Sequence, residues 1–169
     1  MSDLVPVVRE LLQTTSRMLI DATSDLTVDQ VNWLPPGTAN TIGHTYAHIV
    51  NIQDRYLNTF ILGQPTIWER EGWGERLGLP ETMRMSREAA AQMRLDPSSF
   101  RAYAERVFAE TMTYLERVDA AELAREVQGY RGPITVAEVI GRMMPFHAIS
   151  HLGEVAVLRG LQGLKGLPF

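Results

Sequence analysis

The chain has 169 residues, of which 16 are basic, 20 are acidic and none is cysteine. This length is enough for one domain with a substantial hydrophobic core, and we expect residues 1–169 to form a single domain. The net charge of −4 and the absence of a Lys/Arg-rich block exclude the electrostatic signature of a nucleic-acid-binding protein. Without cysteine, neither disulfides nor thiolate ligands can form, so any bound metal must be held by nitrogen and oxygen atoms.

The N-terminal residues MSDLVPVVRELL contain an early Asp and Pro and lack the basic and apolar regions of a signal peptide. No apolar run approaches the ~18 residues that a membrane-spanning helix needs. We therefore expect a soluble, cytoplasmic protein without a membrane partner. The apolar residues from Leu4 to Ala22 recur at helical spacing and predict a first amphipathic helix of roughly five turns, which ends near Ser24.

A second helix is predicted over TIGHTYAHIVNIQDRYLNTFIL, residues 41–62. The connector before it, DLTVDQVNWLPPGTAN, contains two prolines and a glycine and has room for only a short turn. Asn40 or Thr41 caps the second helix, and Gly63 and Pro65 close it.

The third and fourth helices have clear start signals. Asp96 as N-cap and Pro97 in the first helical position begin the third helix. The fourth begins at TVAE, residues 135–138, which has the spacing of a capping box, and it runs to about Gly160. No segment shows convincing strand alternation. We therefore expect an all-α protein, a four-helix bundle with a long irregular or helical connection over residues 63–95 between helices two and three.

All four histidines of the chain occur in two pairs at i, i+4 spacing. HTYAH contains His44 and His48, and HAISH contains His147 and His151. Side chains four residues apart on a helix have Cβ atoms about 5–6 Å apart, which is close enough for two imidazoles to bind one divalent ion. A third histidine from a neighbouring helix would complete a catalytic type of site that keeps open positions.

We expect both pairs to face the interior of the bundle. At about 100° per residue, His147 and His151 share a sector with the apolar residues of the fourth helix, and Glu154 falls in the same sector. On the second helix, the other pair shares a polar face with Asn51 and Arg55. One such pair is weak evidence for a metal, because histidines often occur in cores or on surfaces without one. Two pairs on separate helices favour a metal site between facing helices.

Two further features have more than one interpretation. The connection over residues 63–95 contains Trp68 and Trp73 among glycines, which suits either a cover over a pocket or a dimer contact. Pro145 lies inside the fourth helix, where it removes the backbone hydrogen bond to Gly141 and is expected to kink the helix. The kink serves either packing or the aim of the histidines that follow it.

The histidine segments resemble those of a known family. NTIGHTYAHIVNIQDRYL resembles the NSIGWLLxHI element of the DinB-like superfamily. HAISHLGEVAVLRGLQGLKGLPF resembles that family's closing signature of His, three residues, His, any residue, Gly, then Gln or Glu, followed by LRxLxG. The likeness extends to LTVDQVNWLPPG and SSFRAYAERV, so it covers most of the chain. The resemblance implies a metal-binding four-helix bundle, often a homodimer, with His48, His147 and His151 as its metal ligands.

The resemblance also implies classes of activity. Family members with a known reaction include thiol-dependent transferases and isomerases that use mycothiol or bacillithiol, others are described as metal-dependent hydrolases, and some are induced by DNA damage. We therefore expect a metal-dependent enzyme of the S-transferase or hydrolase class that acts on a small molecule, with a low-molecular-weight thiol as co-substrate of a transferase. The alternatives are a stress-related metal-binding protein without catalysis and a helical interaction module.

A site of three histidines with open positions suits zinc or nickel, and the residues do not distinguish these two metals. Such an ion lowers the pKa of bound water for hydrolysis or binds a substrate thiol as thiolate. Glu154 is the candidate for a carboxylate that orients a ligand or acts as general base. Asn51 and Arg55 are candidates for holding an anionic substrate group. Each of the three is equally explained as a polar residue paired on its own helix.

His44 departs from the family pattern, because it stands where the family often has tryptophan. It is therefore not carried over as a metal ligand. The interpretations left open are a fourth ligand, a group that contacts substrate or orients a ligand, a proton carrier, and a polar residue at the start of a helix. Catalytic metal sites typically keep three protein ligands and an open position, which favours the interpretations other than a ligand.

Overall fold

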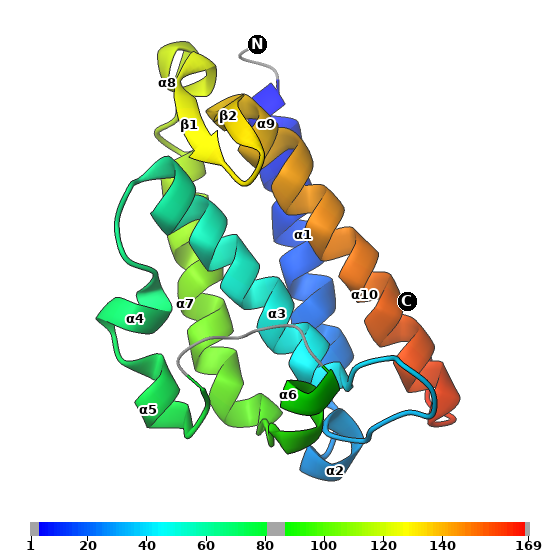
Figure 1. The fold of residues 1–169 in the computed structure, drawn as a ribbon. Coiled ribbons are helices and arrows are strands. Elements are labelled where there is room, and N and C mark those ends of the chain that lie inside the picture. The colour runs from blue at the N-terminus through cyan, green and yellow to red at the C-terminus, as the bar shows by residue number, and fades with distance from the viewer. Residues whose placement is uncertain (1–3, 81–86, 168–169) are drawn as a thin grey trace.

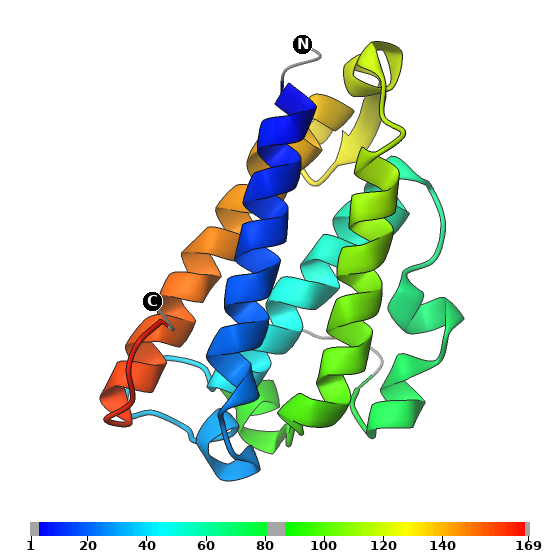
Figure 2. The ribbon, with the colours of Figure 1, turned by 180° about the vertical axis from the view of Figure 1, so that it is seen from behind.

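The computed structural model describes residues 4–80 and 87–167 and has four long helices, with shorter elements at one end and along one side (Figure 1). The long helices are α1 (Leu4–Ser24), α3 (Ile42–Arg55), α7 (Pro97–Leu115) and α10 (Met144–Leu161). α1 packs against α7 and α10, and α3 packs against the same two helices. Seen from behind, α1 lies in front of α3, so these two helices are diagonal in the bundle (Figure 2). The expected all-α four-helix bundle is confirmed.

Start signals read from the sequence are confirmed at three helices. Thr41 caps α3, and Asp96 caps α7, which has a proline in its first turn. Thr135 and Glu138 form the capping box of the fourth helical region. The connector between α1 and α3 contains one further short helix, α2 (Val28–Val31), with a capping box of its own. These signals are local hydrogen bonds between a side chain and the first free N–H groups of a helix, so they can be recognised without the tertiary structure.

The long connection between α3 and α7 follows from their relative direction. The two helices lie side by side and run the same way (Figure 1), and such a pair cannot be joined by a short turn. The chain returns along the outside of the bundle through α4 (Ile67–Arg70), α5 (Trp73–Leu77) and α6 (Arg87–Gln92). Trp68 and Trp73 are buried against Tyr103 of α7, with ring centroids 5.0 and 5.7 Å from the tyrosine ring. Both tryptophans therefore belong to the core of this chain.

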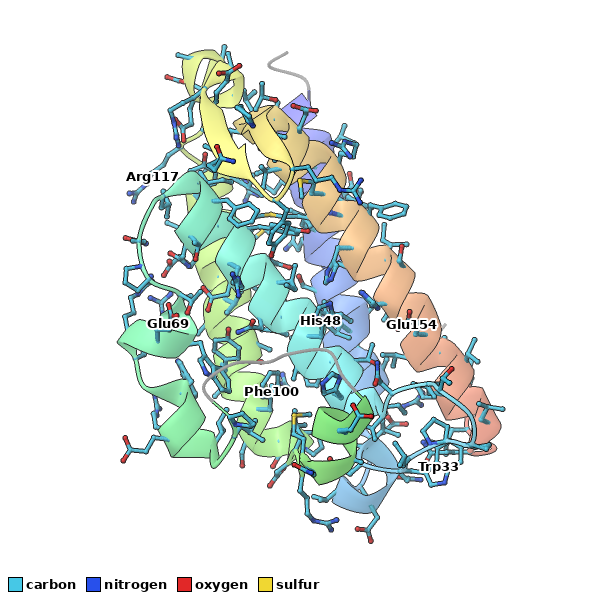
Figure 3. The ribbon with its side chains drawn as sticks, in the orientation of Figure 1. Trp33, His48, Glu69, Phe100, Arg117 and Glu154 are labelled. Atoms are coloured by element: carbon cyan, nitrogen blue, oxygen red, sulfur yellow. The ribbon has the colours of Figure 1, made fainter. Side chains whose placement is uncertain are left out.

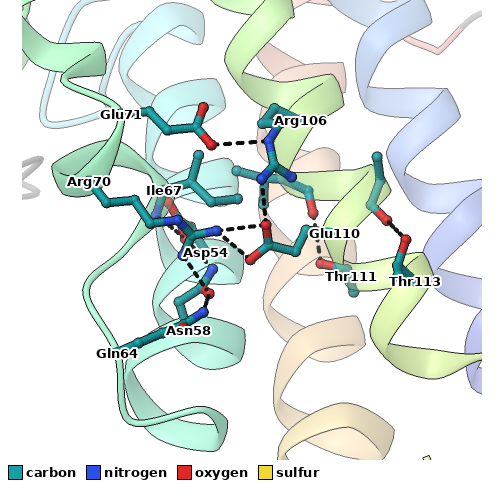
Figure 4. Close-up of polar contacts among 12 residues, drawn as sticks. Asp54, Asn58, Gln64, Ile67, Arg70, Glu71, Arg106, Glu110, Thr111 and Thr113 are labelled. Atoms are coloured by element: carbon teal, nitrogen blue, oxygen red, sulfur yellow. Dashed lines mark hydrogen bonds and ion pairs between the residues drawn. The ribbon is translucent and has the colours of Figure 1, made fainter. Parts of the chain in front are cut away.

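Asp54 of α3 anchors this connection. Its side chain is completely buried, and its two carboxylate oxygens accept the backbone N–H groups of Ile67 and Trp68 at 2.9 and 3.0 Å. The hydroxyl of Tyr103 donates to it at 2.7 Å, and the amide of Asn58 at 2.8 Å. We call Asp54 with these four partners the Asp54 clamp. Figure 4 shows Asp54 and Asn58 next to ion pairs that join Arg70 of α4 and the following Glu71 to Glu110 and Arg106 of α7, respectively. Arg106 and Glu110 also pair with each other within α7.

The expectation that the chain has no strands was wrong for residues 126–135. After α8 (Ala120–Ala124), β1 (Glu126–Gly129) and β2 (Gly132–Thr135) form an antiparallel hairpin in which Gly129 pairs with Gly132. Tyr130 and Arg131 form its loop. Each strand has only four residues, which is too few for alternation of apolar and polar residues to be recognised in the sequence.

The fourth helix is irregular directly before Pro145, where the sequence predicts a kink. It begins as α9 (Val136–Glu138), widens into a π-helical segment, η2 (Val139–Met143), and continues as α10. Pro145 lies in the first turn of α10, where its missing N–H leaves no α-helical hydrogen bond broken. A second π-helical segment, η1 (Tyr56–Ile61), extends α3. The proline is thus accommodated by a wider turn directly before the histidines of α10.

Candidate metal centre

His48 of α3 meets His147 and His151 of α10 where the two helices pack together. The Nε2 atoms of His48 and His147 are 2.9 Å apart, and one ring nitrogen from each residue lies within 4.8 Å of the other two. The three ring centroids are between 4.6 and 5.0 Å apart. Figure 3 marks His48 on α3 opposite α10, which carries Glu154. Nitrogen ligands at about 2.0–2.1 Å from a tetrahedral ion are about 3.3 Å apart, so small side-chain movements would seat an ion here.

Packing around the histidines fixes the two helices that carry them. Ala47, next to His48, and Ala148 and Leu152, next to the histidines of α10, are buried in the same hydrophobic cluster. Small alanine side chains allow α3 and α10 to approach closely. The three rings themselves are only partly buried, which differs from the expectation that they face the interior of the core. The reason is that the histidines lie at the edge of the α3–α10 contact and border a cavity.

Burial keeps two of the histidines neutral at physiological pH. It lowers the pKa of His48 to about 3, and the nearby His147, His151 and His44 lower it further. The pKa of His147 is lowered to about 4, again by burial and then by His151. An imidazole must be unprotonated to bind a metal, so these low pKa values suit metal ligands.

The facing ring nitrogens of the cluster are poorly satisfied without an ion. The Nε2 atom of His48 lies 2.9 Å from the Nε2 atom of His147, and one of two neutral imidazoles must then donate to the other. A divalent ion would accept both lone pairs instead. The three nitrogen donors therefore fit a bound metal better than they fit one another.

Glu154 holds the third histidine in place. Its Oε2 atom is 2.8 Å from Nδ1 of His151, and its side chain is 54% exposed. A carboxylate that accepts the Nδ1 proton leaves Nε2 of the same ring for a metal and makes that nitrogen more basic. The contact suits the ligand-orienting role expected of Glu154, while its role as general base stays a prediction.

The remaining predicted site residues lie around this cluster without joining it. His44 is buried in the first turn of α3, where its N–H donates to Thr41, and it is not one of the three converging histidines. Asn51 is buried. Arg55 is exposed. The structure does not bring Asn51 or Arg55 to the histidines, and their roles in substrate binding stay predictions.

A cavity of about 490 Å³ opens beside His147 and His151, and we call it the first cavity. The ring of Tyr56 lies 6.1 Å from that of His147 and also packs against Tyr130 of the hairpin. Burial raises the pKa of Tyr56. The other residues that line the cavity, all from η2 and α10, are Arg142, Met143, Phe146 and Ser150.

Tyr56, Arg142 and Ser150 were not predicted from the sequence as site residues. Arg142 belongs to no motif recognised in the sequence, and Tyr56 reads as one more apolar residue of its helix. Their positions depend on the π-helical turn and on the contact between α3 and α10. Only the spacing of Ser150, which stands between two predicted ligands on one helix, offered a signal.

Comparisons with known proteins agree with this geometry. The family model of the DinB superfamily matches residues 11–155, which include all three histidines. A conserved protein of Enterococcus faecalis, known from a crystal structure, has the same fold, with a TM-score of 0.81 and 18% sequence identity over 92% of this chain and 95% of that one. No curated protein matches the chain. Among the described residues, no helix has both the length and the apolar character that a membrane crossing requires. Because the family model covers most of the sequence, the chain belongs to the DinB superfamily.

Proposed function

We propose that this protein is a divalent-metal-dependent enzyme whose ion is held by His48, His147 and His151. The observation that carries the proposal is the convergence of three imidazoles from two facing helices at the edge of a cavity. Three histidine ligands leave coordination positions free, as catalytic metal sites do. When bound, zinc or nickel would supply Lewis acidity and lower the pKa of a water or thiol in the free position.

The residues of the first cavity indicate how a substrate would be held. Tyr56 and Ser150 present hydroxyl groups next to His147 and His151, and either can donate a hydrogen bond to a substrate oxygen. Arg142 supplies positive charge for an anionic group, and its ion pair with Glu138 is long, at 3.5 Å, and exposed. Met143 and Phe146 form an apolar wall. The substrate is therefore a small molecule with an apolar part and an anionic group.

Of the two reaction classes, this cavity favours transfer from a low-molecular-weight thiol over hydrolysis. None of the described residues that line it is a carboxylate, and Glu154 is bound to His151. A thiol with a pKa of about 8.5 needs less help in losing its proton than water with a pKa of about 15.7. A site without a free general base therefore suits a thiol substrate better.

The test begins with metal analysis of protein purified without an affinity tag, followed by a thiol-transfer and hydrolysis screen of zinc-loaded, nickel-loaded and chelated protein. We expect about one ion per chain, activity that depends on the ion, and retention of helical circular dichroism after chelation. Chelation should also lower the melting temperature, because an ion at a hundredfold excess over its Kd stabilises the fold by about 2.7 kcal/mol. Stoichiometric metal without activity would indicate a metal-binding protein that is not an enzyme, and absence of metal would indicate an interaction module.

Tyr56→Phe tests the proposed contact with substrate, because it removes only a hydroxyl group. We expect lower turnover, by about tenfold, with unchanged metal content, since the hydroxyl contacts the substrate and not the ion. Equal turnover of the two proteins would remove Tyr56 from the proposed site. The homodimer implied by the family resemblance and the cytoplasmic location expected from the N-terminal sequence stay predictions, and analytical ultracentrifugation would measure the first.

A further inference from the structure

A second and larger cavity lies along α10 on the other side of the His151–Glu154 pair. Its volume is about 720 Å³, within the usual range for small-molecule sites. It lies between the second half of α10, the start of α3 and the connector that precedes α3, which Figure 1 shows passing beside the end of α10. The cavity is lined by Thr38, Ala39, Asn40, Thr45, Ser150, Gly153, Glu154, Val157, Leu158 and Leu161. Ser150 also lines the first cavity, so the two cavities adjoin.

The end of this second cavity that is nearest the histidines is bordered by the polar residues Thr45, Ser150 and Glu154. Glu154 uses Oε2 for His151, and no contact to its Oε1 atom occurs among the described residues. A hydrogen-bond donor placed here would reach a carboxylate oxygen that is coupled to the metal centre through His151.

The rest of the second cavity is apolar and open. Val157 and Leu161 are 64% and 60% exposed, which is high for large aliphatic side chains. Gly153 contributes no side chain, and a Cβ added there would meet no atom within 4 Å. No described residue fills the space next to Gly153. An apolar molecule in that space would cover Val157 and Leu161.

Charge limits the ligand. Glu154 is the single charged residue among the described residues that line the cavity, so an anion would be repelled. A divalent ion on the neighbouring histidines would in turn disfavour an organic cation. An uncharged ligand avoids both penalties.

We propose that the second cavity binds an uncharged small molecule with an apolar body and a hydroxyl group that donates to Glu154. Binding itself requires no metal. The assignment of this molecule as a second substrate, placed next to the first at Ser150, rests on the function proposed above. It makes the protein a two-substrate enzyme with one cavity on each side of the His151–Glu154 pair.

Benzyl alcohol and benzoate are suitable probes, because they share a ring and differ in charge. Amide chemical shifts of ¹⁵N-labelled protein would be followed during titration of each probe. We expect benzyl alcohol to shift the amides of Thr45, Ser150 and Gly153. Benzoate should bind to the second cavity up to about fivefold more weakly, as expected for an exposed charge effect. Equal binding of the two probes, or shifts confined to the residues of the first cavity, would overturn the proposal.

Two glycines of α10 provide a matched pair of variants. Gly153→Leu fills the second cavity, whereas Gly160→Leu places the same side chain at a position that is also open but does not line the cavity. Both replace a helical glycine and should stabilise the helix by up to about 1 kcal/mol. We expect benzyl alcohol to bind about tenfold more weakly to Gly153→Leu, a change of about 1.4 kcal/mol, and unchanged binding to Gly160→Leu. Unchanged binding to Gly153→Leu would refute the site. Val157 is an exposed residue of the cavity wall, and Val157→Glu should block binding of benzyl alcohol independently.

The same titration on chelated and metal-loaded protein separates this inference from the proposed function. Binding of benzyl alcohol to a protein that takes up no zinc or nickel when these ions are supplied would support the second cavity and reject the metal-dependent enzyme. Full metal occupancy without binding of benzyl alcohol would support the metal centre and reject the second cavity.

Discussion

Helix α3 carries two polar clusters, the buried Asp54 clamp and the partly buried histidine cluster around His48, and they differ in how completely their hydrogen bonds are satisfied. Asp54 is fully buried, yet both carboxylate oxygens accept hydrogen bonds from donors within 3.0 Å. The Nε2 atom of His48 faces the Nε2 atom of His147 at 2.9 Å, so only one of the two can donate to the other. The Asp54 clamp is complete as the chain folds, whereas the two facing imidazole nitrogens would both be satisfied by a bound ion.

The difference separates a structural from a functional use of buried polar groups. Burial raises the pKa of Asp54, and the hydrogen bonds from Ile67, Tyr103, Trp68 and Asn58 lower it in part, so the protein itself compensates the buried carboxylate. Burial instead lowers the pKa values of His48 and His147, so these rings are unprotonated and their lone pairs are available. We infer that the Asp54 clamp serves stability and the histidine cluster serves binding.

The largest effect is expected when the complete cluster is broken. Asp54→Ala leaves the N–H groups of Ile67 and Trp68 and the hydroxyl of Tyr103 buried without an acceptor. We expect the free energy of unfolding to fall by about 3–5 kcal/mol in urea denaturation, as for removal of one member of a buried charged network. Thr113→Ala is a suitable control, because the hydroxyl of Thr113 is exposed and bonds only to the carbonyl of Ala109. A loss below about 1 kcal/mol would show that the clamp does not hold the connection in place.

The histidine cluster should respond in metal content more than in stability. His48→Ala, His147→Ala and His151→Ala should each lower metal affinity by more than about a hundredfold, since each removes one of only three ligands. His44→Ala should keep its metal, because His44 lies outside the three converging nitrogens. The metal content of the purified variants, measured by mass spectrometry, tests which histidines bind the ion. Near-stoichiometric metal in the His147→Ala protein would exclude this centre.

Glu154→Gln should have a smaller effect of the same kind. The amide keeps the shape of the side chain but weakens its acceptance of the Nδ1 proton of His151. Loss of a carboxylate behind a metal-bound histidine lowers metal affinity by about 10–100-fold, and we expect a value in that range from competition with a chelator. Glu105→Gln, on the exposed face of α7, serves as the control, since Glu105 pairs only with Arg101. An unchanged affinity would mean that Glu154 is a surface residue without influence on the centre.

The smallest effect concerns pH and the metal-free protein. In the folded chain the pKa values of His48 and His147 are about 3 and 4, below the value of about 6.5 in an unfolded chain. As the pH falls below about 6.5, the unfolded chain therefore takes up protons that the folded chain does not, and stability decreases toward pH 4. The double variant His48→Gln, His147→Gln should lose less stability over this interval. Urea titrations of both proteins at several pH values would measure the difference, and identical curves would contradict it.

Much of the site was predictable because its signals are local. The i, i+4 spacing of His147 and His151 places both rings on one helix face in any α-helix, and Glu154 follows at a spacing that reaches His151. The caps at Thr41 and Asp96 involve residues only two or three positions apart. Each of these contacts forms within a single turn, so no knowledge of the bundle is needed.

The sequence by itself thus determined where the long helices begin, that they form a bundle, and that the histidines occur in pairs. The family resemblance had already named His48 rather than His44 as a ligand. The tertiary structure alone decided that Tyr56 and Arg142 border the same cavity and that Asp54 closes a complete clamp. It also decided the hairpin and the π-helical turn before Pro145. The physical reason is that these features depend on contacts between residues far apart in the chain, whose geometry is set by the way α3 and α10 pack against each other and not by the spacing of residues along either helix.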